Sequence, residues 1–170
     1  MYKYLLYFLI FSFLGWCAEV TFCFFKHGRF VNRGLARGPV CPIYGIGICL
    51  CKVLLGAVEN FILLTLFAMA IATVVELGVG FFTHKMLGVR LWDYTGERGN
   101  IFGYVCPRFS LIWGVMCAVV IKLLPLLDSV VELMYDPFCS AVAVVLFVMV
   151  VVDSKNAMRD KTELSKRLNG

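Results

Sequence analysis

The pattern along this chain consists of five long hydrophobic runs separated by short polar connections. A helix that crosses the hydrocarbon core of a bilayer needs roughly 20 predominantly apolar residues. The runs that meet or nearly meet this length cover residues 2–25, 40–58, 61–83, 109–127 and 130–152. The second run is the shortest and contains Gly45 and Gly47. We therefore expect a shortened, tilted or partly broken helix there.

The composition of the chain agrees with this pattern. Hydrophobic residues make up 61% and charged residues 16% of the 170 residues, and the mean hydropathy is +0.88. These values lie far outside the usage of soluble domains. The first run is too long for the hydrophobic part of a signal peptide, so we expect it to remain as a helix. We predict an all-α integral membrane protein with one transmembrane domain over 1–152, five transmembrane helices and a charged tail over 153–170.

Basic residues alternate along the chain and indicate its orientation. The connections over 26–39 and 84–108 and the C-terminal tail are rich in Lys and Arg, whereas those near residue 59 and over 128–136 contain none. Connections rich in Lys and Arg stay on the cytoplasmic side of a membrane. The pattern predicts five crossings, with the N-terminus outside and the tail in the cytoplasm.

Two similar stretches indicate an internal duplication. Residues 19–27 and 76–84 both read Glu, four residues, Phe-Phe-x-His, and each is followed by Gly-x-Val-Cys-Pro, at 38–42 and at 103–107. A repeated order of two patterns is the signature of duplicated structural units. With the predicted orientation, the halves are related by an axis along the membrane normal. The predicted repeats cover about 1–58 and 61–127, and the fifth helix at 130–152 lies outside them.

Each copy carries one carboxylate below the predicted cytoplasmic interface. Glu19 precedes Lys26 by seven residues, which is about 10 Å along a helix, and Glu76 precedes Lys85 by nine. A charged group at this depth costs on the order of 2.5–3.5 kcal/mol and therefore faces a bundle interior, a partner or water. We predict one polar site where the two glutamates meet and take a proton or cation. The alternative is that each glutamate only connects helices.

The two cytoplasmic connections contain glycines, prolines and large aromatic residues, which indicate a backbone folded against the helices as a cap. Arg33, Arg37 and Arg108 are candidate partners for the glutamates or for an anionic group. The positive-inside rule alone also explains these arginines, and an interfacial aromatic belt explains Trp92 and Tyr94. The candidate ligand-binding or ion-coupling residues are Glu19, Glu76, Asn32, Arg33, Arg37, Tyr44, Trp92, Asp93, Tyr94, Asn100, Arg108 and Trp113.

Several short motifs between Gly15 and Gly114 resemble a known family. They are Gly15-Trp16 with Glu19, Asn32-Arg33-Gly34, Gly38-Pro39, Pro42-Ile43-Tyr44-Gly45, Glu76, Trp92-Asp93-Tyr94, Asn100, Gly103 and Trp113-Gly114. Together they resemble the bacterial integral membrane proteins named Putative ABC-transporter type IV, to which a small group of animal transmembrane proteins is related. The resemblance implies a permease in the bacterial plasma membrane. The chain departs from the family's pattern at Ala36, Arg37 and Arg108, which leaves the role of the arginines open.

The absence of several catalytic and nucleotide-binding motifs reduces the number of functions that the sequence supports. The sequence contains no Walker A motif, so an ABC-type system needs a separate ATPase subunit as partner. It also lacks Ser-His-Asp, His-Glu-x-x-His and Gly-x-Ser-x-Gly arrangements, and its eight cysteines have no zinc-site spacing. We therefore predict no enzyme activity, no metal and no cofactor.

Three function classes stay open, and a transport component, permease or channel, is favoured. A structural or regulatory membrane subunit is the first alternative. The second is a lipid-modifying enzyme, because carboxylates near histidines can do acid–base chemistry on a head group. The expected partners are the lipid bilayer and a second copy in a symmetric dimer. Nucleic acid is not implied, since membrane topology explains the basic excess.

Overall fold

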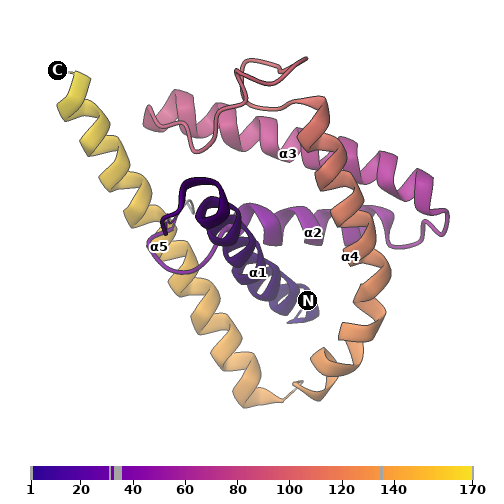
Figure 1. The fold of residues 1–170 in the computed structure, drawn as a ribbon. Coiled ribbons are helices and arrows are strands. Elements are labelled where there is room, and N and C mark those ends of the chain that lie inside the picture. The colour runs from indigo at the N-terminus through magenta and orange to yellow at the C-terminus, as the bar shows by residue number, and fades with distance from the viewer. Residues whose placement is uncertain (1, 31, 33–35, 135, 170) are drawn as a thin grey trace.

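The computed structural model describes residues 2–30, 32, 36–134 and 136–169, with 26, 27 and 164–169 described by their backbone alone (Figure 1). The described residues form helices and contain no strand, which confirms the predicted all-α class. The helices are α1 (Tyr2–His27), α2 (Pro42–Leu55), α3 (Phe61–Leu87), α4 (Pro107–Leu133) and α5 (Pro137–Asn169).

The helix boundaries follow local sequence signals. Helices α2 and α4 begin at Pro42 and Pro107, the last residues of the two Gly-x-Val-Cys-Pro stretches. Proline suits the first helical turn because its ring fixes φ and the N–H that it lacks would have no helical partner. Helix α3 begins after Asn60, whose side chain accepts hydrogen bonds from the Ile62 and Leu63 amides, both at 3.0 Å.

Two predicted boundaries need correction. The predicted second helix over 40–58 is shorter in the structure, where α2 has 14 residues and is about 21 Å long. That length is below the roughly 30 Å of a bilayer's hydrocarbon core. Helices α1, α3, α4 and α5 are long and apolar enough to cross a membrane, so four of the described helices meet the length criterion.

The second correction concerns the connection between the last two runs. The sequence predicts one helix ending at 127 and another beginning at 130, but α4 continues to Leu133 and α5 begins at Pro137. Asp128 belongs to the helix because α1 provides its partners. Lys3 Nζ lies 2.8 Å from Asp128 Oδ1, and the Tyr7 hydroxyl donates a hydrogen bond to the same oxygen.

Contacts show how the ends of the helices are grouped. The backbone N–H of Gly38 donates to Asp153 at 2.8 Å, so the part of the first connection just before α2 lies against the middle of α5 (Figure 1). At the opposite end of the bundle, Lys122 Nζ on α4 donates to the carbonyl of Glu59 in the α2–α3 turn at 2.8 Å. Which end faces the cytoplasm stays a prediction of the charge pattern.

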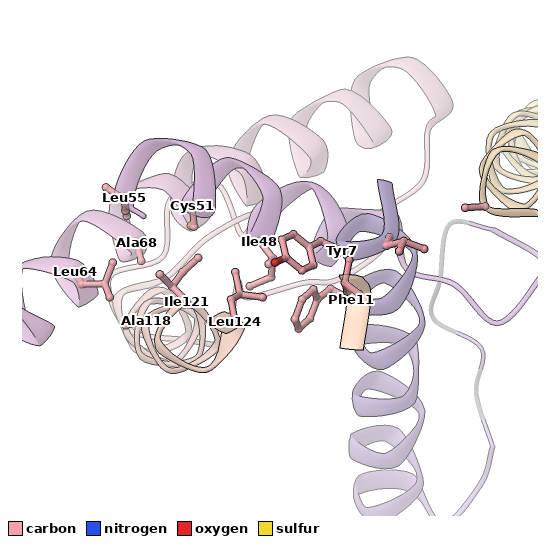
Figure 2. Close-up of a cluster of buried hydrophobic side chains, with 13 residues drawn as sticks. Tyr7, Phe11, Ile48, Cys51, Leu55, Leu64, Ala68, Ala118, Ile121 and Leu124 are labelled. Carbon is pink, nitrogen blue, oxygen red and sulfur yellow. The ribbon is translucent and has the colours of Figure 1, made fainter. Parts of the chain in front are cut away.

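The core lies where α1, α2, α3 and α4 meet (Figure 2). Leu64, Ala68, Ala118 and Leu124 in this cluster have no exposed surface. Small residues allow close helix contacts, as at Gly114, where an added Cβ would lie 2.6 Å from Met69 Cβ. Many large apolar side chains are exposed instead, which suits surfaces that face lipid.

Candidate functional site

Glu76 on α3 is a buried carboxylate at the centre of the candidate site. Its exposed fraction is 7%. The Tyr94 hydroxyl donates to Glu76 Oε1 at 2.8 Å, and the Trp113 indole N–H donates to the same oxygen at 3.3 Å. The second oxygen, Oε2, has no hydrogen-bond partner among the described residues. One carboxylate oxygen is thus satisfied by neutral donors, and the other can accept a further donor.

Glu19 on α1 has a similar partner from α2. The Tyr44 hydroxyl donates to Glu19 Oε1 at 2.6 Å. The Tyr44 ring lies directly over Gly15 on α1, where an added Cβ would be 2.5 Å from Tyr44 Cδ2. Glycine at position 15 therefore makes room for the tyrosine that reaches Glu19.

The two glutamates are connected through a pair of aromatic rings. Tyr44 meets Trp113 edge to face, with ring centres 5.5 Å apart and an interplanar angle of 83°. Tyr44 bonds to Glu19 and Trp113 bonds to Glu76, so the residues form a continuous series across α1, α2, α4 and α3. This places four of the predicted site residues together.

The connection over 88–106 positions Tyr94 next to Glu76, at one end of this series. The Tyr94 backbone N–H donates to the Gly103 carbonyl at 2.9 Å, and the Tyr94 ring stacks on Phe109 of α4, with centres 4.7 Å apart. Trp92 stabilises the same segment, because its indole N–H donates to the Tyr104 carbonyl at 2.8 Å. These contacts hold the Tyr94 hydroxyl in a defined position at Glu76.

The Tyr94 hydroxyl remains a hydrogen-bond donor under ordinary conditions. Burial raises the pKa of Tyr94 above its usual value, and the charge of Glu76 and the hydrogen bond to it raise the pKa further. The charge of Glu19 contributes in the same direction. The phenol therefore stays protonated beside the two carboxylates.

Three predicted site residues form hydrogen bonds that shape the two connections. Asn32 accepts from the Trp16 indole at 3.0 Å and donates to the Arg37 carbonyl at 3.0 Å. Asn100 donates to the Glu97 carbonyl at 2.8 Å. Asp93 accepts from the Thr95 amide at 3.0 Å. The bond from Thr95 is the main cause that lowers the pKa of Asp93.

Arg37 and Arg108 form ion pairs with carboxylates other than Glu19 and Glu76. Arg37 pairs with Asp160 on α5, and the hydrogen bond that Arg37 donates to Asp160 is the main cause that raises the pKa of Arg37. Arg108 Nη1 lies 3.5 Å from Glu97 Oε1, with 70% of its side chain exposed. The structure thus pairs both arginines with other carboxylates. Arg33, the third arginine predicted, lies outside the described residues.

Sequence reasoning missed Phe109 and the pair of His84 and Tyr104. Phe109 follows Cys106-Pro107 by the same spacing as Tyr44 follows Cys41-Pro42, so comparing the two copies could have found it. His84 Nδ1 lies 2.6 Å from the Tyr104 hydroxyl, and the Tyr104 backbone follows Gly103. No spacing in the sequence indicates this contact, because it depends on how the 88–106 connection folds.

A family model described as Putative ABC-transporter type IV matches residues 6–157. The chain belongs to this family. The match extends beyond the motifs between Gly15 and Gly114 and includes the first part of α5. Four long apolar helices among the described residues, together with family membership, support a multi-pass membrane transport component. No curated protein and no solved structure matches the chain.

Proposed function

We propose that this family member is a permease or channel component with a polar intramembrane site built on Glu19 and Glu76. The two connections over 28–41 and 88–106 cap the site, and it takes a proton or a cation. The observation that carries the proposal is the state of Glu76, which is buried and has one oxygen without a partner among the described residues.

The energetics of Glu76 favour a positively charged ligand. An acidic side chain at membrane depth is costly unless a partner or water compensates it. In the described part of the chain, Glu76 bonds to Tyr94 and Trp113, which are neutral, and contacts no cationic side chain. A proton or a bound cation would supply the missing compensation, and a site that gains and loses such a ligand can serve transport.

The residues around the two glutamates favour a ligand-binding site, and not only a contact that holds two helices together. Tyr44 and Trp113 connect Glu19 with Glu76 across four helices. A contact that only joins two helices needs one donor and one acceptor, whereas this series joins the two halves of the chain. We also propose, on the basis of family membership, that an ABC-type ATPase subunit is a partner, and, on the basis of small bundle size, that the protein forms a homodimer.

The test is cation flux in proteoliposomes containing the purified protein. Proton entry is measured with an enclosed pH-sensitive dye, and sodium or potassium entry with ion-sensitive dyes. We expect Glu19→Gln and Glu76→Gln each to abolish the flux, because glutamine keeps the shape of the side chain and removes its charge. The double variant should be no worse than either single one, as for residues that act as a unit.

Glu59→Gln is the matched control, since Glu59 is an exposed residue in the α2–α3 turn and should not affect flux. Unchanged flux in both site variants, together with a lower thermal midpoint of unfolding, would show that the glutamates only stabilise the bundle. No flux with the wild-type protein in intact vesicles would count against a channel and favour a regulatory subunit.

A further inference from the structure

Four aromatic side chains from three parts of the fold gather around Glu76. Tyr94, from the 88–106 connection, and Trp113, from α4, both contact the carboxylate. Tyr44 on α2 lies edge to face against Trp113, and Phe109 on α4 stacks on Tyr94. Two of these aromatic residues therefore contact the carboxylate, and the other two pack against them.

One oxygen of the Glu76 carboxylate remains available as a hydrogen-bond acceptor beside these aromatic residues. Both donors bind Glu76 Oε1, and Oε2 has no partner among the described residues although the side chain is only 7% exposed. A buried acceptor of this kind is satisfied when a ligand brings a donor. Aromatic ring faces also attract cations, and the attraction is strongest when the cation is desolvated. Organic ammonium ions are recognised by aromatic residues in this way.

The residue types fit an organic cation better than a bare metal ion. Hard metal cations take about six or more oxygen ligands. Around Glu76, the Tyr94 hydroxyl and the Trp113 indole act as donors, and the other neighbours named above are rings. Within the described residues, no group of three or more His, Cys, Asp or Glu side chains is placed to hold a metal.

We propose that the ligand of the Glu76 site is an organic ammonium ion that carries an apolar or aromatic group. Its N–H donates to Glu76 Oε2, and its apolar part lies against the rings of Trp113 and Tyr44. This inference rests on the transport function proposed above and adds the substrate class.

A fluorescence titration tests the substrate class directly. The chain has three tryptophans, so the variant Trp16→Phe/Trp92→Phe leaves Trp113 as the only tryptophan reporter at the site. The probe is benzylammonium. Benzyl alcohol is the neutral control with the same ring, and sodium chloride is the inorganic control. We expect a saturable change in Trp113 emission with benzylammonium and no saturable change with either control.

Three further variants of this reporter separate the roles of charge, ring and hydroxyl. Glu76→Gln should weaken benzylammonium binding by about tenfold or more, the loss expected for a charge-assisted hydrogen bond. Tyr44→Leu should weaken binding because it removes the ring against Trp113. Tyr44→Phe should keep the affinity within about threefold, because the ring remains. Circular dichroism and size-exclusion chromatography establish that each variant is folded.

Calorimetric titration of the wild-type protein gives the same comparison if the double tryptophan variant does not fold. Equal binding of benzylammonium and benzyl alcohol, unchanged binding in Glu76→Gln, or no binding to the wild-type protein would each overturn the substrate class. The proposed function fails separately, because it is judged by proton and metal-cation flux in Glu76→Gln vesicles. Flux that depends on Glu76 without benzylammonium binding would keep the function and remove the organic cation.

Discussion

Tyr44 and Trp113 meet edge to face, with ring centres 5.5 Å apart, and each bonds to a different glutamate. The two residues come from α2 and α4, the helices that begin at the two Cys-Pro stretches. This contact therefore joins the two halves of the chain at the level of their carboxylates.

Glu76 should react with a hydrophobic carbodiimide. Such reagents partition into apolar regions and modify carboxylic acids that are protonated, and Glu76 is buried within an apolar helix. We expect mass spectrometry to find the adduct on Glu76. Glu59, exposed in the α2–α3 turn, should stay unmodified under the same conditions. Labelling of Glu59 without Glu76 would show that Glu76 does not bind a proton.

Gly45→Ala should destabilise the contact between α1 and α2. A Cβ at this position would lie 2.5 Å from the Phe8 carbonyl oxygen, and overpacking of this kind costs about 1–3 kcal/mol. Gly47→Ala is the matched control on the same helix, because nothing lies within 4 Å of its added Cβ. We expect a lower thermal midpoint for the first variant in detergent and an unchanged or slightly higher one for the second. Equal midpoints for the two variants would contradict the close packing of α1 and α2.

Tyr94 contributes through both its hydroxyl and its ring. Tyr94→Phe removes the hydrogen bond to Glu76 and should cost about 1–3 kcal/mol, as expected when a buried polar group loses a hydrogen-bond partner. Tyr94→Leu also removes the stacking on Phe109 and should cost a further amount of about 0.5–1.5 kcal/mol. Thermal unfolding of the three proteins in one detergent measures this order. If leucine and phenylalanine give the same midpoint, the stacking contributes nothing measurable.

The orientation in the membrane can be tested at two glutamates. The charge pattern predicts that the C-terminal half of α5 is cytoplasmic and that the α2–α3 turn is outside. A membrane-impermeant maleimide should therefore label Glu59→Cys on intact cells and Glu163→Cys only after the cells are opened. The parent protein, with its eight native cysteines, gives the background. The reverse pattern would invert the predicted topology.

The hydrophobic pattern by itself determined that this is a helical membrane protein. Long runs without charge can satisfy their backbone groups in lipid only as helices, so α1, α3 and the first part of α4 could be predicted from the length and hydrophobicity of the runs. The positions of Glu19 and Glu76 along α1 and α3 also followed from the chain, because position along a helix converts directly to distance. The ends of α4 and α5 did not follow, since Asp128 looks like a connection residue until Lys3 and Tyr7 provide its partners.

Only the tertiary structure decided which side chains meet the glutamates. Tyr94 lies 18 residues after Glu76 and Trp113 lies 37 residues after it, and these separations have no fixed meaning in space. Arg37 shows the same limit, because the predicted partners were Glu19, Glu76 or an anionic group, and Asp160, 123 residues away, is the partner found. The sequence shows which side chains are costly to bury. Packing decides which neighbours compensate them, because contacts across helices depend on how every helix and connection fits at once.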